Sequence, residues 1–128
     1  MHLVVPTAVR PLVIIVDDDP AVRSSLAFSL ELEGFQVDAC ESGEALLLRN
    51  LPDAHACLVI DERLPGISGL QALAQLRGRK VNLPALLITS NPKPATRAAA
   101  AAAGVPIVEK PLLCDALSGS IRAALAGI

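Results

Sequence analysis

The sequence predicts an α/β fold in which helices cover both faces of a parallel sheet. Apolar, strand-like runs alternate five times with segments of helical periodicity, and short loops separate them. Because short strand-helix-strand units form parallel strands through right-handed crossovers, we expect a doubly wound, three-layer domain. The chain has 128 residues, 52% hydrophobic and only 2% aromatic, so one domain with an aliphatic core is expected.

The five predicted strands are short apolar runs bounded by turn residues. The first, "LVIIV" at residues 12–16, is rich in β-branched side chains and is typical of a strand buried on both faces. The others are residues 36–39, 57–60, 83–88 and 106–108. This order places a helix after each strand.

The first helix has start and stop signals at both ends. Asp19 is suited to the N-cap, Pro20 to the first helical position, and Gly34 to a left-handed termination. Its apolar stripe consists of Val22, Leu26, Ala27 and Leu30. We therefore expect this helix to begin directly after the aspartates that end the first strand.

Residues that start or stop helices, together with the spacing of apolar residues, predict four more helices. The second begins after Ser42 and runs to about Leu51, before Pro52, and the third lies between the Pro65-Gly66 turn and Gly78. The fourth covers residues 95–103 and is closed by Gly104. The fifth is indicated by apolar residues at three-to-four residue spacing, namely Leu113, Leu117, Ile121, Leu125 and Ile128.

Polar residues follow four of the five predicted strands. These residues are Asp17, Asp18 and Asp19 after the first strand, Asp61 after the third, Thr89 after the fourth and Lys110 just beyond the fifth. Ligands of doubly wound folds bind beyond the carboxyl ends of the strands. We therefore expect these side chains to share one rim of the sheet and to form a site there.

The residue types indicate a magnesium and phosphoryl site. Carboxylates of Asp17, Asp18 and Asp61 about 4–5 Å apart would repel by roughly 3–4 kcal/mol per pair at an effective dielectric constant near 20, so they require a cation. Oxygen ligands without nearby His or Cys favour Mg²⁺. Lys110 adds a fixed positive charge and Thr89 a hydroxyl donor, which together suit phosphoryl transfer. Asp61 would be the nucleophile and would form an aspartyl phosphate.

Each of these residues also has an ordinary structural interpretation. Asp19 is assigned to the helix cap, Lys110 before Pro111 could be a solvated loop lysine, and Thr89 could be a plain strand-end hydroxyl. Taken singly, the structural interpretation is favoured for each. Their joint occurrence at one end of several strands in an otherwise apolar chain favours the functional site.

Composition limits the partners and the location. The net charge of −2 gives no electrostatic reason for direct binding to nucleic acid or to an anionic membrane. No apolar run is long enough for a membrane helix. Cys40, Cys57 and Cys114 lie among apolar residues without metal-ligand spacing, so we expect buried thiols and a reducing, cytoplasmic location. We interpret residues 1–10 as a loose lead-in and residues 11–128 as the domain.

The motifs resemble the receiver domain of two-component response regulators. "VDDDPAVR" is similar to the acidic motif, "LVIDERLPGISGLQAL" to the phosphoacceptor segment, "LLITSN" to the switch threonine and "VEKPL" to the lysine-proline motif. The spacing around "SGEALL" and "RLPGISG" is most similar to the nitrogen-fixation type of receiver. The resemblance implies a flavodoxin-like sheet of five parallel strands in the order 2-1-3-4-5.

The resemblance also implies roles for individual residues. Asp18 and Asp61 would ligate Mg²⁺ directly, Asp17 mainly through water, and Arg63 through its backbone carbonyl. Asp61 would accept the phosphoryl group from a histidine kinase or a phosphotransfer protein, Lys110 would bind it and Thr89 would close on it. Such a domain catalyses only its own phosphorylation and dephosphorylation, so no enzyme activity on another substrate is expected. Its output face would be the fourth helix, fifth strand and fifth helix, which could also form a homodimer.

Two departures from the family pattern leave alternatives open. Ile107 occupies a position that is usually aromatic, so the usual aromatic rotamer switch cannot operate. The segment "NPKPATRAAAAAAGVP" predicts a displaced or remodelled fourth helix, whose alanines form either a partner surface or a plain helix. A degenerate receiver that only docks a partner is therefore one alternative.

A phosphatase with an aspartyl-phosphate intermediate is another alternative. It would need a second acid two residues after the nucleophile, where this chain has Arg63. We also hypothesise that Glu62, Arg63 and Asn91 set the lifetime of the phosphoryl group.

Overall fold

The computed structural model describes residues 10–112 and 114–127, with five strands and five helices in strict alternation. The strands are β1 (Leu12–Val16), β2 (Gln36–Cys40), β3 (Ala56–Asp61), β4 (Ala85–Thr89) and β5 (Ile107–Glu109). The helices are α1 (Pro20–Leu32), α2 (Gly43–Leu47), α3 (Gly69–Gly78), α4 (Pro94–Ala102) and α5 (Cys114–Leu125). This alternation confirms the predicted order of elements.

All five strands are parallel and form one sheet in the order β2-β1-β3-β4-β5, which confirms the predicted flavodoxin-like topology. The register pairs Val16 with Ile60, Asp61 with Ile88, and Thr89 with Glu109. The carboxyl ends of β1, β3, β4 and β5 therefore finish close to one another. This rim is where the polar residues were expected.

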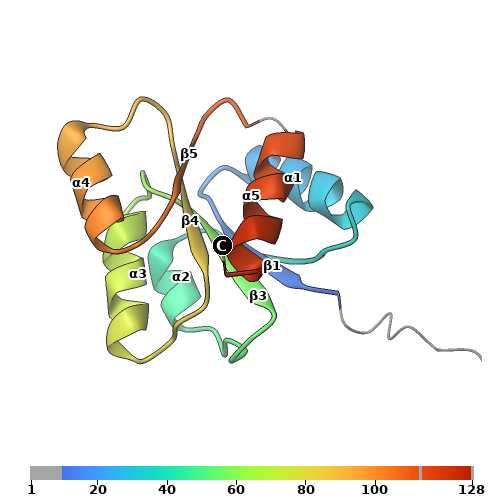
Figure 1. Ribbon diagram of the computed structural model, residues 1–128, viewed down its shortest axis with the longest axis horizontal. Helices are drawn as coiled ribbons and strands as arrows, with labels where there is room; N and C mark the ends of the chain where they lie inside the picture. The colour runs from blue at the N-terminus through green and yellow to red at the C-terminus, as the bar shows by residue number, and fades with distance from the viewer. Residues whose placement is uncertain (1–9, 113, 128) are drawn as a thin grey trace, which may run out of the picture.

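Helices cover the sheet on both sides (Figure 1), with α1 and α5 on one face and α2, α3 and α4 on the other. Alternate residues of β1 supply the two cores, because successive side chains of a strand point to opposite faces. Val13 and Ile15 pack under α1 and α5, whereas Ile14 and Val16 pack under the other three helices. The central strands are buried on both faces, as their apolar sequences predict.

The second helix is shorter than predicted, since it ends at Leu47 rather than near Leu51. Leu48 is 88% exposed and offers no apolar contact that would extend the helix. The guanidinium of Arg49 bonds the carbonyl of Ala39 at 2.8 Å and pairs with the carboxylate of Asp38. These contacts with β2 hold the chain where the helical periodicity stops.

Two strands begin later than predicted, and proline explains both differences. Leu83 and Pro106 were expected inside strands, but β4 begins at Ala85 and β5 at Ile107. Pro84 and Pro106 have no N–H to donate to a ladder, although their carbonyls accept bonds from Leu58 and Leu87 at 2.9 Å. Each proline therefore stands just before a strand.

The fourth helix is regular but loosely attached. Of its residues only Ala100 is buried, and its N-cap residue, Lys93, makes no side-chain hydrogen bond to the first turn. By contrast, α3 buries four residues and has a full capping box between Ser68 and Gln71.

Some predictions fall on residues that the structure does not describe. These are nearly all of the lead-in, the packing of Leu113 and Ile128, and the side chain of Cys114. Cys40 and Cys57 are buried, as expected. Among the described residues, no helix combines the length and the apolar character needed to span a bilayer. The Lys110-Pro111 peptide bond is cis.

Candidate functional site

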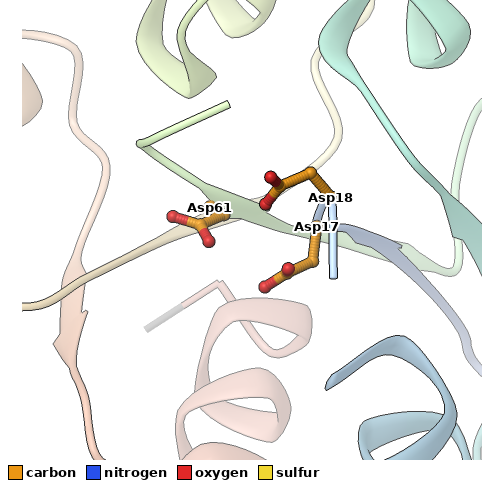
Figure 2. Close-up of side chains that lie close together, drawn as sticks. All are labelled: Asp17, Asp18 and Asp61. Atoms are coloured by element: carbon orange, nitrogen blue, oxygen red, sulfur yellow. The ribbon is translucent and has the colours of Figure 1, made fainter. Parts of the chain in front are cut away.

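The three aspartates at the ends of β1 and β3 converge at one point of the rim. One carboxylate oxygen from each of Asp17, Asp18 and Asp61 lies within 4.8 Å of the others, and Figure 2 shows the three side chains gathered around the end of β3. Asp17 and Asp61 are 4% and 5% exposed, whereas Asp18 is exposed. The predicted acidic cluster is therefore present, with two of its carboxylates buried.

Asp17 is held through its backbone and its side chain. Its N–H donates to the carbonyl of Cys40 at 3.1 Å, and its Oδ1 accepts from the N–H of Asp19 at 2.9 Å. Its carbonyl accepts from Nη1 of Arg23 at 2.7 Å. Asp19 instead uses its carboxylate to accept from the N–H of Ala21, which confirms its predicted role as the cap of α1.

Burial and the neighbouring carboxylate both oppose the ionisation of Asp17. Burial raises the pKa of Asp17 above its usual range, and the nearby charge of Asp61 raises this pKa further. The N–H of Asp19 and the ammonium of Lys110 act in the opposite direction. A divalent ion bound among these oxygens would offset the repulsion between the carboxylates.

Asp61 has donors on both carboxylate oxygens. The backbone N–H of Arg63 donates to Oδ1 at 3.0 Å, and Nζ of Lys110 donates to Oδ2, also at 3.0 Å. Lys110 is in turn placed by its own N–H, which bonds the carbonyl of Thr89 at 3.0 Å. Thr89 is only 3% exposed. Asp61 and Thr89 are the last residues of β3 and β4, and Arg63 and Lys110 lie in the loops that follow β3 and β5.

A cavity of about 310 Å³ joins all of these groups. It is lined by Asp17, Asp18, Asp19, Val22, Asp61, Arg63, Thr89, Ser90 and Lys110. The cavity thus contains every residue that the sequence analysis assigned to the site. Ser90 and Val22 line it as well and were not predicted.

The loop from β3 to α3 is fastened by contacts that the sequence analysis missed. Oε1 of Glu62 accepts from the N–H of Leu70 at 2.9 Å, and Oε2 of Glu44 accepts from the N–H of Ile67 at 3.1 Å. A Cβ at Gly69 would lie 2.5 Å from the carbonyl oxygen of Asp61, so only glycine allows this approach. The Ser68-x-x-Gln71 pattern is a sequence signal for the start of α3. The hydrogen bond between Glu44 and Ile67 has no such signal, because the two residues are far apart in the sequence.

Of the three residues in the hypothesis about the phosphoryl lifetime, only Arg63 lines the cavity of the three carboxylates. Asn91 lines an adjoining cavity of about 230 Å³ rather than the cavity of the three carboxylates, and it has a left-handed φ of 50°. Arg63 and Thr89 line both cavities. Because the Glu62 carboxylate is bonded to Leu70, it stabilises the loop.

Ile107, at the position expected to be aromatic, is partly buried against the core under α2, α3 and α4. Beside it, Nη2 of Arg97 on α4 pairs with Oε2 of Glu109 on β5 at 3.2 Å. Glu109 directly precedes Lys110 and is aligned with Thr89 across the sheet. An ion pair therefore links α4 to the strand that carries the site lysine.

The donor set fits a hard divalent cation. All candidate ligand groups are oxygens, the three carboxylates carry three negative charges, and Lys110 is the one cation that forms an ion pair with them among the described residues. Mg²⁺ prefers few carboxylates together with waters, and a cavity of this size leaves room for both. Asp17, Asp18 and Asp61 are thus the residues that would hold the metal.

Comparisons with known proteins place the chain in a family. Residues 13–122 match the family model described as response regulator receiver domain. Transcriptional regulatory protein FixJ of Azorhizobium caulinodans is 37% identical over 112 residues, which are 87% of this chain and 53% of that protein. FixJ of Rhizobium meliloti is 40% identical over 98 residues, 76% of this chain and 48% of that protein. The chain spans about half the length of these relatives.

Solved structures agree with the sequence relatives. The crystal structure of FixJ-N superposes with a TM-score of 0.79 at 34% identity, covering 92% of this chain and 95% of that one. The response regulator StyR gives a TM-score of 0.79 at 31% identity, covering 91% of this chain and 60% of that one. The chain belongs to the receiver domain family of two-component response regulators, and within that family it is close to the FixJ type.

Proposed function

We propose that this domain is a phosphoacceptor switch in which Asp61 takes up a phosphoryl group in a Mg²⁺-dependent reaction. One observation carries the proposal: Nζ of Lys110 lies 3.0 Å from Oδ2 of Asp61, directly beside the cluster that Asp61 forms with Asp17 and Asp18. The proposed nucleophile Asp61, the ammonium of Lys110 and the cluster of three carboxylates share one cavity. This combination suits phosphoryl transfer, in which positioning and charge neutralisation supply most of the catalysis.

In the proposed reaction a carboxylate oxygen of Asp61 attacks the phosphorus of the donor. A new P–O bond to Asp61 forms as the bond from phosphorus to the donor's nitrogen or oxygen breaks, and the donor leaves with that electron pair. When bound by Asp17, Asp18, Asp61 and the carbonyl of Arg63, Mg²⁺ would neutralise charge on the phosphoryl oxygens. The N–H of Arg63 already fixes the orientation of the Asp61 carboxylate.

Lys110 and Thr89 would respond to the new phosphoryl group. The ammonium of Lys110, now paired with Asp61, would move to the phosphoryl oxygens, because these carry more negative charge than the carboxylate alone. The hydroxyl of Thr89 would donate to the same group. Since the N–H of Lys110 bonds the carbonyl of Thr89, the ends of β4 and β5 would shift together.

The proposed output surface is the face of α4, β5 and α5. In the unphosphorylated form α4 is attached through Ala100 and the Arg97–Glu109 pair, so a shift of β5 would alter its position at low energetic cost. This face would then change its affinity for a partner or for a second copy of the chain. The phosphoryl donor would be a histidine kinase or a phosphotransfer protein, and the domain would act on no other substrate.

The test uses acetyl phosphate as a small phosphoryl donor. With Mg²⁺ present, the intact mass should increase by one phosphoryl group, and removing the metal with EDTA should prevent the increase. The Asp61→Asn variant should show no increase. Asp53→Asn is a matched control, because Asp53 lines a different cavity with His55 and Pro84, and it should react like the parent protein. An increase that persists in Asp61→Asn would contradict the proposal.

A further inference from the structure

The guanidinium of Arg23 holds a backbone carbonyl at the edge of the candidate site. The residue is one turn into α1, and its backbone N–H donates to the carbonyl of Asp19 as part of the helix. Helical side chains lean toward the N-terminus, and the partly buried guanidinium reaches back past the start of the helix to the carbonyl of Asp17 at 2.7 Å. Among the described residues it forms no ion pair with a carboxylate.

The bonded carbonyl belongs to the peptide that joins Asp17 to Asp18. A peptide unit is planar, so holding its carbonyl oxygen also restrains the N–H and the Cα of Asp18, from which the Asp18 side chain extends. The other side of Asp17 is held by the carbonyl of Cys40. Asp17 is therefore held at both its N–H and its carbonyl, which restrains the turn after β1.

Asp18 depends on this orientation more than the other two aspartates. Asp17 and Asp61 are buried and have hydrogen-bond donors on their carboxylates. Asp18 is exposed, and within residues 10–112 and 114–127 the structure records no hydrogen bond to its carboxylate. Its position over the cavity is therefore set by the backbone alone.

We propose that Arg23 is a positioning residue for the metal site, which orients Asp18 by holding the peptide between Asp17 and Asp18. The inference rests on the proposed function, because it assumes that the cluster binds Mg²⁺. Arginine suits the task, since its guanidinium is always protonated and presents several donors in a fixed plane. Partners that orient metal ligands in this way typically change metal affinity by about 10–100-fold when they are removed.

Replacing Arg23 by a neutral residue has two effects, and they change the Mg²⁺ affinity in opposite directions. Removing a positive charge close to a cation site should by itself strengthen Mg²⁺ binding, because it removes a repulsion. Losing the orientation of Asp18 should weaken binding. The Arg23→Met variant, which keeps a long apolar stem but has neither charge nor donor, therefore separates the two effects.

The experiment is calorimetric titration of the full chain with MgCl₂. We expect Arg23→Met to bind Mg²⁺ about tenfold more weakly than the parent protein. The matched control is Arg79→Met, because Nη1 of Arg79 also donates to a backbone carbonyl, that of Leu47, at 2.7 Å, but at the far end of α3. This control should keep the parent affinity. Affinity in Arg23→Met equal to or tighter than that of the parent would overturn the proposal.

A second variant keeps the test decisive if Arg23→Met does not fold. Arg23→Lys retains the charge but has a shorter reach and no planar pair of donors, and we expect it to bind Mg²⁺ more weakly than the parent. Parent affinity in this variant would then overturn the proposal. The thermal midpoint of unfolding is measured without metal for each variant. An unchanged midpoint shows that the variant is folded, so that weaker Mg²⁺ binding reports the lost orientation of Asp18. If the parent protein itself binds no Mg²⁺, it is the proposed function that fails.

Discussion

At the scale of single residues, the chain places like charges where they oppose folding. Asp17 and Asp61 are both nearly inaccessible to water and lie next to each other. Because the pKa of Asp17 is raised in the folded state, its ionised form destabilises the fold once the pH is above that pKa. A purely structural role would not favour this arrangement, whereas a cation site requires it.

Replacing Asp17 by Asn should therefore make the metal-free protein more stable. Asn keeps an oxygen that can accept from the N–H of Asp19 but removes the repulsion with Asp61. Two charges about 5 Å apart at an effective dielectric constant near 20 repel by roughly 3 kcal/mol, and the lost attraction to Lys110 offsets part of this. We expect a gain of about 1 kcal/mol in the free energy of unfolding, measured by urea denaturation with EDTA.

The same substitution should weaken Mg²⁺ binding. Asp53→Asn is the control, since it removes the same charge from a residue that lines a different cavity. It should leave both the stability and the metal affinity close to those of the parent. A metal-free Asp17→Asn protein that is less stable than the parent would contradict this electrostatic account.

Gly69 should tolerate no side chain, because it lies against the carboxyl end of β3. A Cβ there would meet the carbonyl oxygen of Asp61 at 2.5 Å and Cγ2 of Ile60 at 2.9 Å. We expect Gly69→Ala to lower the free energy of unfolding by about 1–3 kcal/mol, as overpacking typically does. A Cβ at Gly78, in the same helix, would meet no other part of the fold within 4 Å, and Gly78→Ala should raise stability by about 0.5–1 kcal/mol. Equal effects at the two positions would contradict the packing argument.

The buried thiol of Cys57 should be unreactive in the native protein. Burial raises its pKa to about 12, so almost no thiolate is present at neutral or mildly alkaline pH. Peptide mapping after treatment with iodoacetamide at about pH 8, below the ordinary thiol pKa, should show Cys57 modified only when the chain is unfolded in urea. Rapid modification of Cys57 in the native protein would contradict this prediction and would mean that β3 becomes exposed to solvent readily.

At the scale of elements, α4 differs from the other helices on its side of the sheet. It buries only Ala100 and lacks a side-chain cap, whereas α3 buries four residues and has a capping box. Elements with few buried contacts open at low free energy. The element that is easiest to move therefore lies beside β5, which carries Glu109 just before the site lysine.

Hydrogen exchange should reveal this difference directly. We expect the amides of α4 to exchange faster than those of α3 at equal pH and temperature. Arg97→Ala should speed exchange in α4 further while lowering global stability by less than about 1 kcal/mol, because the Arg97–Glu109 pair is exposed. Arg77→Ala on α3 is the comparison, as its guanidinium bonds the carbonyl of Val81 away from α4. Protection of α4 equal to that of α3 would contradict the account.

Elements marked by local signals could be predicted from the sequence, and those set by distant contacts could not. Asp19 and Pro20 identified the start of α1 because capping depends only on neighbouring residues. The end of α2 at Leu47 could not be predicted, since it depends on the side chain of Arg49 folding back to β2, a contact for which the sequence has no local signal. The late starts of β4 and β5 did have a local signal, because Pro84 and Pro106 lack an N–H. The prediction followed the apolar pattern of these segments instead and began both strands too early.

At the scale of the whole molecule, parallel topology brings separate motifs into one cavity. Asp17, Asp61, Thr89 and Lys110 are far apart in sequence, and each follows or ends a strand of the same sheet. The rim could be predicted because the carboxyl ends of parallel strands meet at one edge. The contacts that orient the rim, such as those of Arg23 and Glu44, could not be predicted, because they depend on how helices pack against loops.

Because the three carboxylates are brought together only in the folded chain, Mg²⁺ should stabilise the fold as a whole. A ligand that binds only the native state adds about 2.7 kcal/mol of stability at a hundred times its dissociation constant. The thermal midpoint should therefore rise with Mg²⁺ concentration in the parent protein. Asp61→Asn should respond much less, and an equal rise in that variant would place the bound ion elsewhere.

The central claim is that Asp61 receives the phosphoryl group. The most direct measurement is to incubate the chain with Mg²⁺ and acetyl phosphate, reduce the acyl phosphate with sodium borohydride, and map the peptides by tandem mass spectrometry. Borohydride converts a phosphorylated aspartate to homoserine. We predict homoserine at position 61 and unmodified Asp17 and Asp18; homoserine at another aspartate, with Asp61 unchanged, would contradict the account.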